Sequence, residues 1–351
     1  MTNDVASDSV SGLTFTTLRD GGIDHLGIRT RRGIVDVSQA ARALGVSTPP
    51  QTVDDLLAGR GDIGSIQRIA EQAPAAAIRA EHVVEFGPLV SAPPKIICIG
   101  LNYRGHLAET GMSPQTVPDL FNKYNTALNH NGTIAISTID ATEFDYESEL
   151  VVLMGKEARN VSVADALSYV FGYTAGDDFS ARDLQLRTSQ WMTGKTPDQF
   201  APIGPWLVPA DQIGDPQTLQ IQTFVNDEIT PRQDANTSQM IFSVAQIISY
   251  TSKFITFQPG DVIFTGTPSG VILGHPKDKQ ARRPHHDAHF ETRRAPCYPR
   301  LARHVPCGRP PRPKGFSGKI SKAFMHTLFP HCPEPNAGRA SGWQAPASFR
   351  R

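Results

Sequence analysis

Cysteine is scarce in this 351-residue sequence, and three of its four cysteines lie near the C-terminus. Cys98 is the only cysteine in residues 1–280, and the other three fall between residues 281 and 351. A single cysteine excludes the disulfide framework that holds small secreted domains together. We therefore expect residues 1–280 to work in a reducing compartment, and we predict a cytoplasmic location.

Long apolar runs and an N-terminal targeting pattern are also missing. No segment approaches the roughly 20 apolar residues that a membrane-spanning helix needs. The first 18 residues contain two aspartates but no Arg or Lys, whereas signal and transit peptides carry positive charge. The sequence therefore predicts a globular protein with no membrane partner.

The formal net charge is zero, yet the two signs are unevenly distributed. Residues 1–280 contain 20 Lys and Arg against 31 Asp and Glu, whereas residues 281–351 contain 14 against 3, together with 11 of the 28 prolines. A basic, Pro-rich segment without periodicity predicts a disordered tail over 281–351. Its 11 arginines would suit an anionic partner, but it lacks the regular aromatic spacing of single-strand binders, so we do not expect nucleic acid binding.

The remaining 280 residues divide into two predicted units. Residues 1–92 should form a small α+β unit, because residues 13–37 alternate apolar and polar side chains and helical patterns follow. Residues 93–280 contain many short β-type segments with turns between them, which predicts a mainly β (α+β) catalytic domain. The expected helices are 38–44, 52–58, 62–72, 162–168 and 240–253, and the expected strands include 96–99, 133–138, 147–154, 169–175, 205–208, 219–226 and 261–265.

Two carboxylates stand beside each other at the start of an apolar run. Glu147 and Glu149 would point to the same face of a strand, where their charges repel. A hard cation such as Mg²⁺ would relieve that repulsion, and a third carboxylate could come from residues 176–183. A Glu-x-Glu pair is more often a solvated strand edge, so the interpretation depends on other polar residues near strand ends.

Several such residues are present. His106 and Glu109 would share one face of a helix, where the pair could take a proton from water. Lys195 and Lys123 could each bind a carboxylate or an oxyanion, although a single Lys is usually an exposed surface residue. Residues 259–270 predict a tight turn, a strand and then a Gly-bounded loop, which suits either an oxyanion site or an ordinary turn.

Taken in order, these segments resemble the catalytic domain of the fumarylacetoacetate hydrolase family, from about residue 94 to residue 274. The resemblance implies a mixed β-sandwich roll and a homodimer. It also implies a divalent metal, usually Mg²⁺ with Mn²⁺ or Ca²⁺ as alternatives, held by Glu147, Glu149 and Asp178. The matching motifs are Ile99-Gly-Leu-Asn-Tyr-Arg-Gly-His106, Tyr146-Glu-Ser-Glu149, Asp178-Phe-Ser-Ala-Arg-Asp-Leu-Gln185, Gly194-Lys195 and Pro259-Gly-Asp-Val-Ile-Phe-Thr-Gly-Thr-Pro-Ser-Gly270.

The same resemblance implies roles around the metal. His106 and Glu109 match the base that activates water, and Lys195 matches a residue that binds the substrate. We expect the other substrate-binding residues to be Tyr103, Lys123, Arg182, Gln185 and Thr267.

The predicted activity is Mg²⁺-dependent hydrolysis of a C–C bond in a small 2,4-dioxo acid, of the acylpyruvate or fumarylacetoacetate kind. A Lewis acid on the carbonyl oxygens would stabilise the enolate that forms. Because one fold hosts several reactions, an oxaloacetate-type decarboxylase or another 2-oxo acid lyase or isomerase is the alternative. A second alternative is an inactive remnant, because after Lys279 the basic tail replaces the strands that usually close the family's roll.

Overall fold

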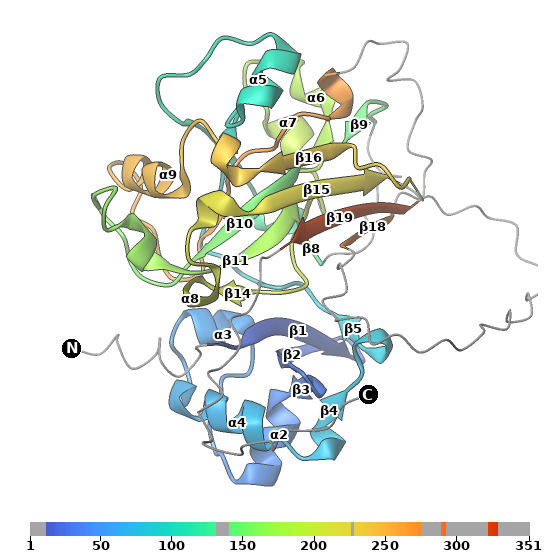
Figure 1. Ribbon diagram of the computed structural model, residues 1–351, viewed down its shortest axis with the longest axis vertical. Coiled ribbons are helices and arrows are strands. Elements are labelled where there is room, and N and C mark those ends of the chain that lie inside the picture. Colours follow the sequence, from blue (N-terminus) through green and yellow to red (C-terminus); the bar gives the residue numbers. More distant parts are fainter. Residues whose placement is uncertain (1–11, 131–139, 226–227, 275–288, 293–321, 329–351) are drawn as a thin grey trace, which may run out of the picture.

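The computed structural model describes residues 12–130, 140–225, 228–274, 289–292 and 322–328 (Figure 1). These residues form a strand-rich α+β fold, as the sequence predicted. The predicted strand at 133–138 lies outside the described residues. No helix in the described ranges is long and apolar enough to cross a membrane.

The N-terminal unit is a five-stranded sheet covered by helices, drawn in blue in Figure 1. The strand order is β4-β3-β2-β1-β5, and all neighbouring strands are antiparallel. The elements are β1 (Thr14–Asp20), β2 (Ile23–Thr30), β3 (Gly33–Asp36), α2 (Val37–Leu44), α3 (Val53–Leu57), α4 (Ile66–Gln72), β4 (Ile78–Arg79) and β5 (Glu85–Phe86).

Local sequence signals explain where these helices begin and end. Asp36 caps α2 by accepting a hydrogen bond from the Gln39 N–H, and Gly45 ends the helix in a left-handed conformation. Thr52 and Asp55 form a reciprocal capping box at the start of α3. The helices predicted within 38–44, 52–58 and 62–72 are therefore confirmed. The helix predicted over 240–253 is shorter, at Val244–Thr251, and the one predicted over 162–168 is only a short 3₁₀ helix at Ala166–Tyr169.

A six-stranded mixed sheet forms the centre of the molecule, in the order β14-β11-β10-β17-β6-β7. β17 and β6 are parallel, and the other neighbours are antiparallel. The strands are β6 (Ile96–Gly100), β7 (Asp119–Lys123), β10 (Ser148–Met154), β11 (Val170–Asp177), β14 (Val208–Pro209) and β17 (Val262–Phe264).

Both faces of this sheet are buried. Along β10, Val151 and Leu153 pack in a core that also contains Phe15 and other residues of the N-terminal unit. Leu150 and Val152 point to the opposite face and pack against a second core, which includes residues of helix α9 (Val244–Thr251). A strand buried on both faces is continuously apolar, which explains the run from residue 150 to 154.

Smaller elements surround the sheet. β15 (Gln220–Val225) and β16 (Gln233–Asn236) form a hairpin, extended by β19 (Lys322–Leu328) and β18 (His289–Thr292). The prediction of a disordered tail did not anticipate β18 and β19, and the rest of residues 281–351 lies outside the described residues. The remaining elements are α5 (Arg104–Thr110), β8 (Leu128–Asn129), β9 (Phe144–Asp145), β12 (Ser180–Ala181), α6 (Arg182–Gln185), α7 (Met192–Lys195), β13 (Ala201–Pro202) and α8 (Ala210–Ile213).

Candidate active site

The register between β10 and β11 brings three carboxylates together. Ser148 pairs with Asp177, and the Asp178 N–H donates a hydrogen bond of 2.9 Å to the Glu147 carbonyl. One ligand oxygen from each of Glu147, Glu149 and Asp178 lies within 4.8 Å of the others. All three residues are buried, with exposed fractions of 5%, 2% and 1%. The solvated strand edge that was the alternative interpretation is therefore not what the structure shows.

Three buried cations contact two of these carboxylates. Lys195 Nζ lies 2.6 Å from Glu147 Oε2 and 2.8 Å from Asp178 Oδ2. Arg182 lies 2.6 Å from Glu147 Oε1, and Lys123 Nζ lies 2.5 Å from Asp178 Oδ1. Burial opposes ionisation of Glu147, but Lys195 and Arg182 prevail and hold its pKa below the usual range.

Glu149 is in a different position, because no Lys or Arg of the described residues is within ion-pair distance of it. Its Oε2 accepts a hydrogen bond of 2.7 Å from the Gly266 N–H. Burial, together with the charges of Asp178 and Glu147, raises the pKa of Glu149 well above its usual value. A divalent cation would remove this penalty, and an all-oxygen donor set suits hard ions such as Mg²⁺ or Mn²⁺. The residues present therefore fit the metal that the sequence predicted.

A histidine and a glutamate meet beside the carboxylates, as their spacing on α5 predicted. His106 Nδ1 lies 2.8 Å from Glu109 Oε1. The Gly270 N–H donates to the other oxygen, Glu109 Oε2, at 3.0 Å, so the carboxylate is held on both sides. A proton on Nδ1 that is donated to Glu109 leaves Nε2 as the basic nitrogen of His106.

Most of the predicted site residues line one pocket. Its lining combines the acidic pair, the histidine and three substrate-binding candidates with apolar side chains. Glu109 contacts His106, and Asp178 contacts Lys195, although neither lines the pocket itself. The predicted residues that line the pocket are His106, Glu147, Glu149, Arg182, Gln185, Lys195 and Thr267.

Two predicted substrate-binding residues lie elsewhere. Tyr103 is fully buried in the second core, and its hydroxyl has no hydrogen-bond partner among the described residues. A backbone bridge joins Tyr103 to Met240, and Tyr103 is not among the residues that line the pocket. Lys123 lies behind Asp178, where Nζ also donates to the carbonyls of Phe179 and Phe200 at 3.1 and 2.9 Å and to that of Lys195. Lys123 therefore supports the carboxylate instead of facing a substrate.

Sequence reasoning missed two buried polar residues. Asp145 binds Arg182 at 2.8 Å and accepts the backbone N–H groups of Ile272 and Leu273, so it joins α6 to the chain after β17. Its place directly before Tyr146-Glu-Ser-Glu149 was the one available signal. Gln233, in β16, hydrogen-bonds to Thr267, and no sequence pattern pointed to it.

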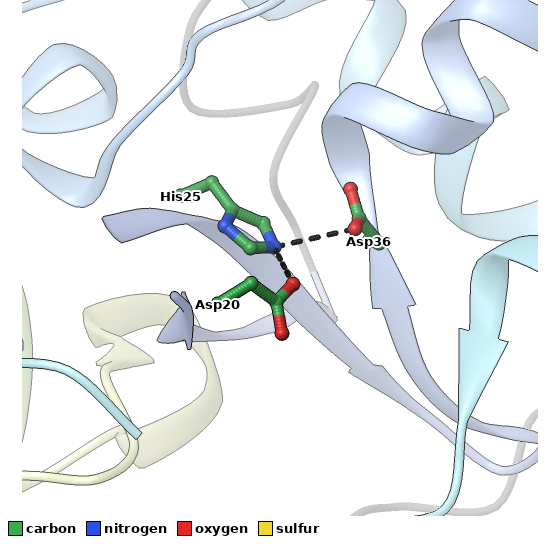
Figure 2. A group of neighbouring side chains, drawn as sticks. All are labelled: Asp20, His25 and Asp36. Carbon is green, nitrogen blue, oxygen red and sulfur yellow. Dashed lines mark ion pairs between the residues drawn. The ribbon is translucent and has the colours of Figure 1, made fainter. Parts of the chain in front are cut away.

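A second group of possible ligands lies in the N-terminal unit (Figure 2). His25 Nε2 lies 3.3 Å from Asp20 Oδ2 and 3.2 Å from Asp36 Oδ2. Arg79 also contacts both aspartates, at 2.7 and 2.9 Å, and Asp20 is half-exposed. The guanidinium already offsets part of the negative charge, so we interpret this group as an ion-pair network.

Comparison with known proteins gives a consistent picture. Residues 95–294 match the family model described as fumarylacetoacetate (FAA) hydrolase C-terminal. A fumarylacetoacetate hydrolase domain-containing protein 2 homolog from Dictyostelium discoideum is 47% identical over 51% of this chain, and the match spans 61% of that protein.

Longer matches include two named enzymes. Oxaloacetate tautomerase Fahd2a, mitochondrial, from Rattus norvegicus is 38% identical over 70% of this chain and 77% of its own length. A 2,4-didehydro-3-deoxy-L-rhamnonate hydrolase from a Sphingomonas species is 40% identical over 71% of this chain and 83% of its own length.

Among solved structures, the fold is similar to that of maleylpyruvate hydrolase from Sphingobium sp. SYK-6, in complex with manganese(II) ion and pyruvate. The TM-score is 0.58 at 30% identity, and the match covers 74% of this chain and 89% of that one.

Proposed function

Because the chain belongs to the fumarylacetoacetate hydrolase family, whose members are enzymes, we propose that it hydrolyses a C–C bond in a small 2,4-dioxo acid with the help of a divalent metal. One observation carries the proposal: a buried carboxylate triad and a His–Glu pair adjoin the same pocket. The triad fits a metal, and the pair fits a base for water.

Glu147, Glu149 and Asp178 would hold the metal, for which we propose Mg²⁺. The manganese ion in the maleylpyruvate hydrolase structure supports a divalent cation in this fold, with Mn²⁺ and Ca²⁺ as alternatives. When bound, such an ion supplies Lewis-acid stabilisation to a developing enolate.

The residues of the chain would move the protons. His106 Nε2 takes a proton from water while Glu109 stabilises the resulting imidazolium, a contribution of about 100- to 10,000-fold in rate. The water oxygen forms a bond to the distal carbonyl carbon, the C–C bond breaks, and its electron pair becomes the enolate. His106 then returns the proton to carbon, which yields a carboxylic acid and a 2-oxo acid. Lys195 and Arg182 add positive charge beside the anionic substrate, and Gln185 and Thr267 line the same pocket.

The apolar part of the lining favours an uncharged acyl group. Arg182 and Lys195 are the two basic side chains among the described lining residues apart from His106, and both already contact carboxylates. Trp191 packs edge-on against Phe121 with ring centroids 5.4 Å apart, and both rings line the pocket. The other large apolar lining residues are Ile99, Leu101, Met112, Leu186 and Leu273.

Tautomerisation or decarboxylation of oxaloacetate is the second candidate. The rat relative is named an oxaloacetate tautomerase, and a base such as His106 could move a proton between carbon and the enol oxygen without attack by water. A third candidate, an inactive remnant, follows from the unusual tail.

The first experiment measures the thermal midpoint of the full chain in EDTA and then in millimolar Mg²⁺ or Mn²⁺. A ligand that binds the folded state raises this midpoint. We expect a rise in the wild type and in Asp20→Ala, and none in Glu147→Ala. A thermal midpoint that neither metal raises would favour the inactive remnant.

The second experiment separates the reactions. Acylpyruvates with short alkyl groups, fumarylpyruvate and oxaloacetate are compared by kcat/KM, with tautomerisation of oxaloacetate followed separately. We expect the alkyl compounds to be preferred. Faster turnover of oxaloacetate than of every acylpyruvate would replace hydrolysis by the second candidate.

The homodimer and the cytoplasmic location are also proposals. Light scattering after size-exclusion chromatography tests the first, and cell fractionation tests the second.

A further inference from the structure

The strand pairing between β10 and β17 ends before it reaches Glu149. β10 pairs with β17 only as far as Val151 opposite Phe264. Beyond this pair, the Thr265 N–H donates to the Leu150 carbonyl at 3.2 Å, and the Gly266 N–H donates to the Glu149 side chain. On this edge of β10, no strand of the described residues reaches Ser148, which separates Glu147 from Glu149. Buried backbone groups need partners, so side chains must supply them here.

Gln233 closes a ring of hydrogen bonds around Ser148. Its Oε1 accepts the Ser148 N–H at 3.0 Å, and its Nε2 donates to Thr267 Oγ1 at 2.8 Å. The Thr267 hydroxyl in turn donates to the Ser148 carbonyl at 3.0 Å. Both backbone groups of the residue between the two glutamates are therefore bound by this ring.

The buried amide of Gln233 fills all of its hydrogen-bond donor and acceptor positions. The residue is 0% exposed. Oε1 also accepts the Thr223 hydroxyl at 2.7 Å, and Nε2 also donates to the Pro268 carbonyl at 2.9 Å. A carboxamide is the neutral side chain that offers two acceptor and two donor positions in one plane. It therefore joins the loop after β17 to β10 without adding charge beside the triad.

We propose that Gln233 is a positioning residue that sets the direction of the Glu147 and Glu149 carboxylates. The inference rests on the metal site of the proposed function. Glu147 and Glu149 extend from the residues on either side of the ring, and Gly266, which binds Glu149, precedes Thr267 in the chain. Loss of the ring would leave the carboxylates in place but less well aligned, and such losses commonly cost about 10- to 100-fold in metal affinity.

The test compares Gln233→Met with Gln222→Met in the full chain. Methionine has nearly the volume of glutamine but cannot form the ring. Gln222 lies on the neighbouring strand β15, where its amide donates to Asp234 instead, so it is a matched control. Calorimetric titration with Mn²⁺ should show binding about 10- to 100-fold weaker in Gln233→Met and unchanged in Gln222→Met.

A second measurement does not depend on metal or substrate. Hydrogen exchange at the Ser148 amide should accelerate at least about 10-fold in Gln233→Met, because that amide loses its acceptor. If the wild type binds no Mn²⁺, the proposed function fails, and this exchange rate alone decides whether Gln233 positions the strand.

If Gln233→Met does not fold, Gln233→Asn tests the same proposal. It keeps the amide but is one methylene too short to reach both Ser148 and Thr267. A folded variant of either kind with wild-type Mn²⁺ affinity and wild-type protection at Ser148 would overturn the proposal.

Discussion

The molecule contains two groups of three possible ligand side chains, and in each the ligand atoms lie within 4.8 Å of one another, but the surroundings of the two groups differ. In the first group Asp20 is exposed, His25 is partly buried and only Asp36 is buried, and Arg79 contacts both aspartates. Glu147, Glu149 and Asp178 are all buried, and Glu149 lacks a cationic partner in the described structure. Closeness of the ligand atoms therefore does not identify a metal site; burial of every member and a carboxylate without a cationic partner do.

Glu149→Gln should have the largest effect on turnover. Glutamine cannot supply the negative charge, so we expect turnover to fall at least about 10,000-fold, as when an essential catalytic group is removed. Mg²⁺ should no longer raise the thermal midpoint. Retention of full turnover would contradict the assignment of Glu149 as a ligand.

The same variant should be more stable than the wild type when both are free of metal. Burial and the neighbouring Asp178 and Glu147 raise the pKa of Glu149, so its ionised form costs free energy at pH 7. Glutamine removes that cost, and the gain should vanish below about pH 4, where the carboxyl is protonated in both folded and unfolded chains. Urea denaturation in EDTA at pH 7 and at low pH measures the difference.

His106→Gln should remove the base while leaving metal binding intact. We expect turnover to fall about 100- to 10,000-fold because water loses its proton acceptor. The Mn²⁺ affinity should not change, since His106 is not one of the three carboxylates. Unchanged hydrolysis would show that another group is the base.

Lys123→Met tests the buried cation behind Asp178. Three backbone carbonyls and one carboxylate lose their donor, and breaking a buried pair commonly costs about 3 to 5 kcal/mol in the free energy of unfolding. Urea denaturation should show this loss, whereas Lys253→Met, at an exposed position, should change little. Equal stability of the two variants would contradict the structural role.

Asp36→Ala should have the smallest effect and should leave the pocket unaffected. The variant loses the N-cap of α2 and a contact with Arg79, which together are worth about 1 to 2 kcal/mol. Titration with Mn²⁺ should give the wild-type affinity. A weaker affinity would mean that the two acidic groups are coupled.

The two groups also show what the sequence can predict. Glu147 and Glu149 were found because a strand has a period of two, and His106 and Glu109 because residues three apart share a helix face. The structure brings both pairs to one pocket.

Residues whose role depends on packing were less predictable. Lys123 and Tyr103 have the right chemistry, but the place of each residue depends on a neighbour distant in sequence. Gln233 acts through contacts that include Ser148 and Thr267, 85 and 34 positions away, which no local pattern encodes.

The core that Phe15 shares with Val151 has a consequence for how the chain can be divided. A boundary near residue 92 follows the sequence, but the apolar contacts and the Phe15 and Leu207 backbone hydrogen bonds cross it. A chain shortened to residues 93–351 would expose one face of the central sheet, so we expect it to aggregate. For the same reason, heating should melt the N-terminal helices and the central sheet in one cooperative transition. The unfolding midpoint reported by a fluorophore near α2 would then rise when metal binds at the distant pocket.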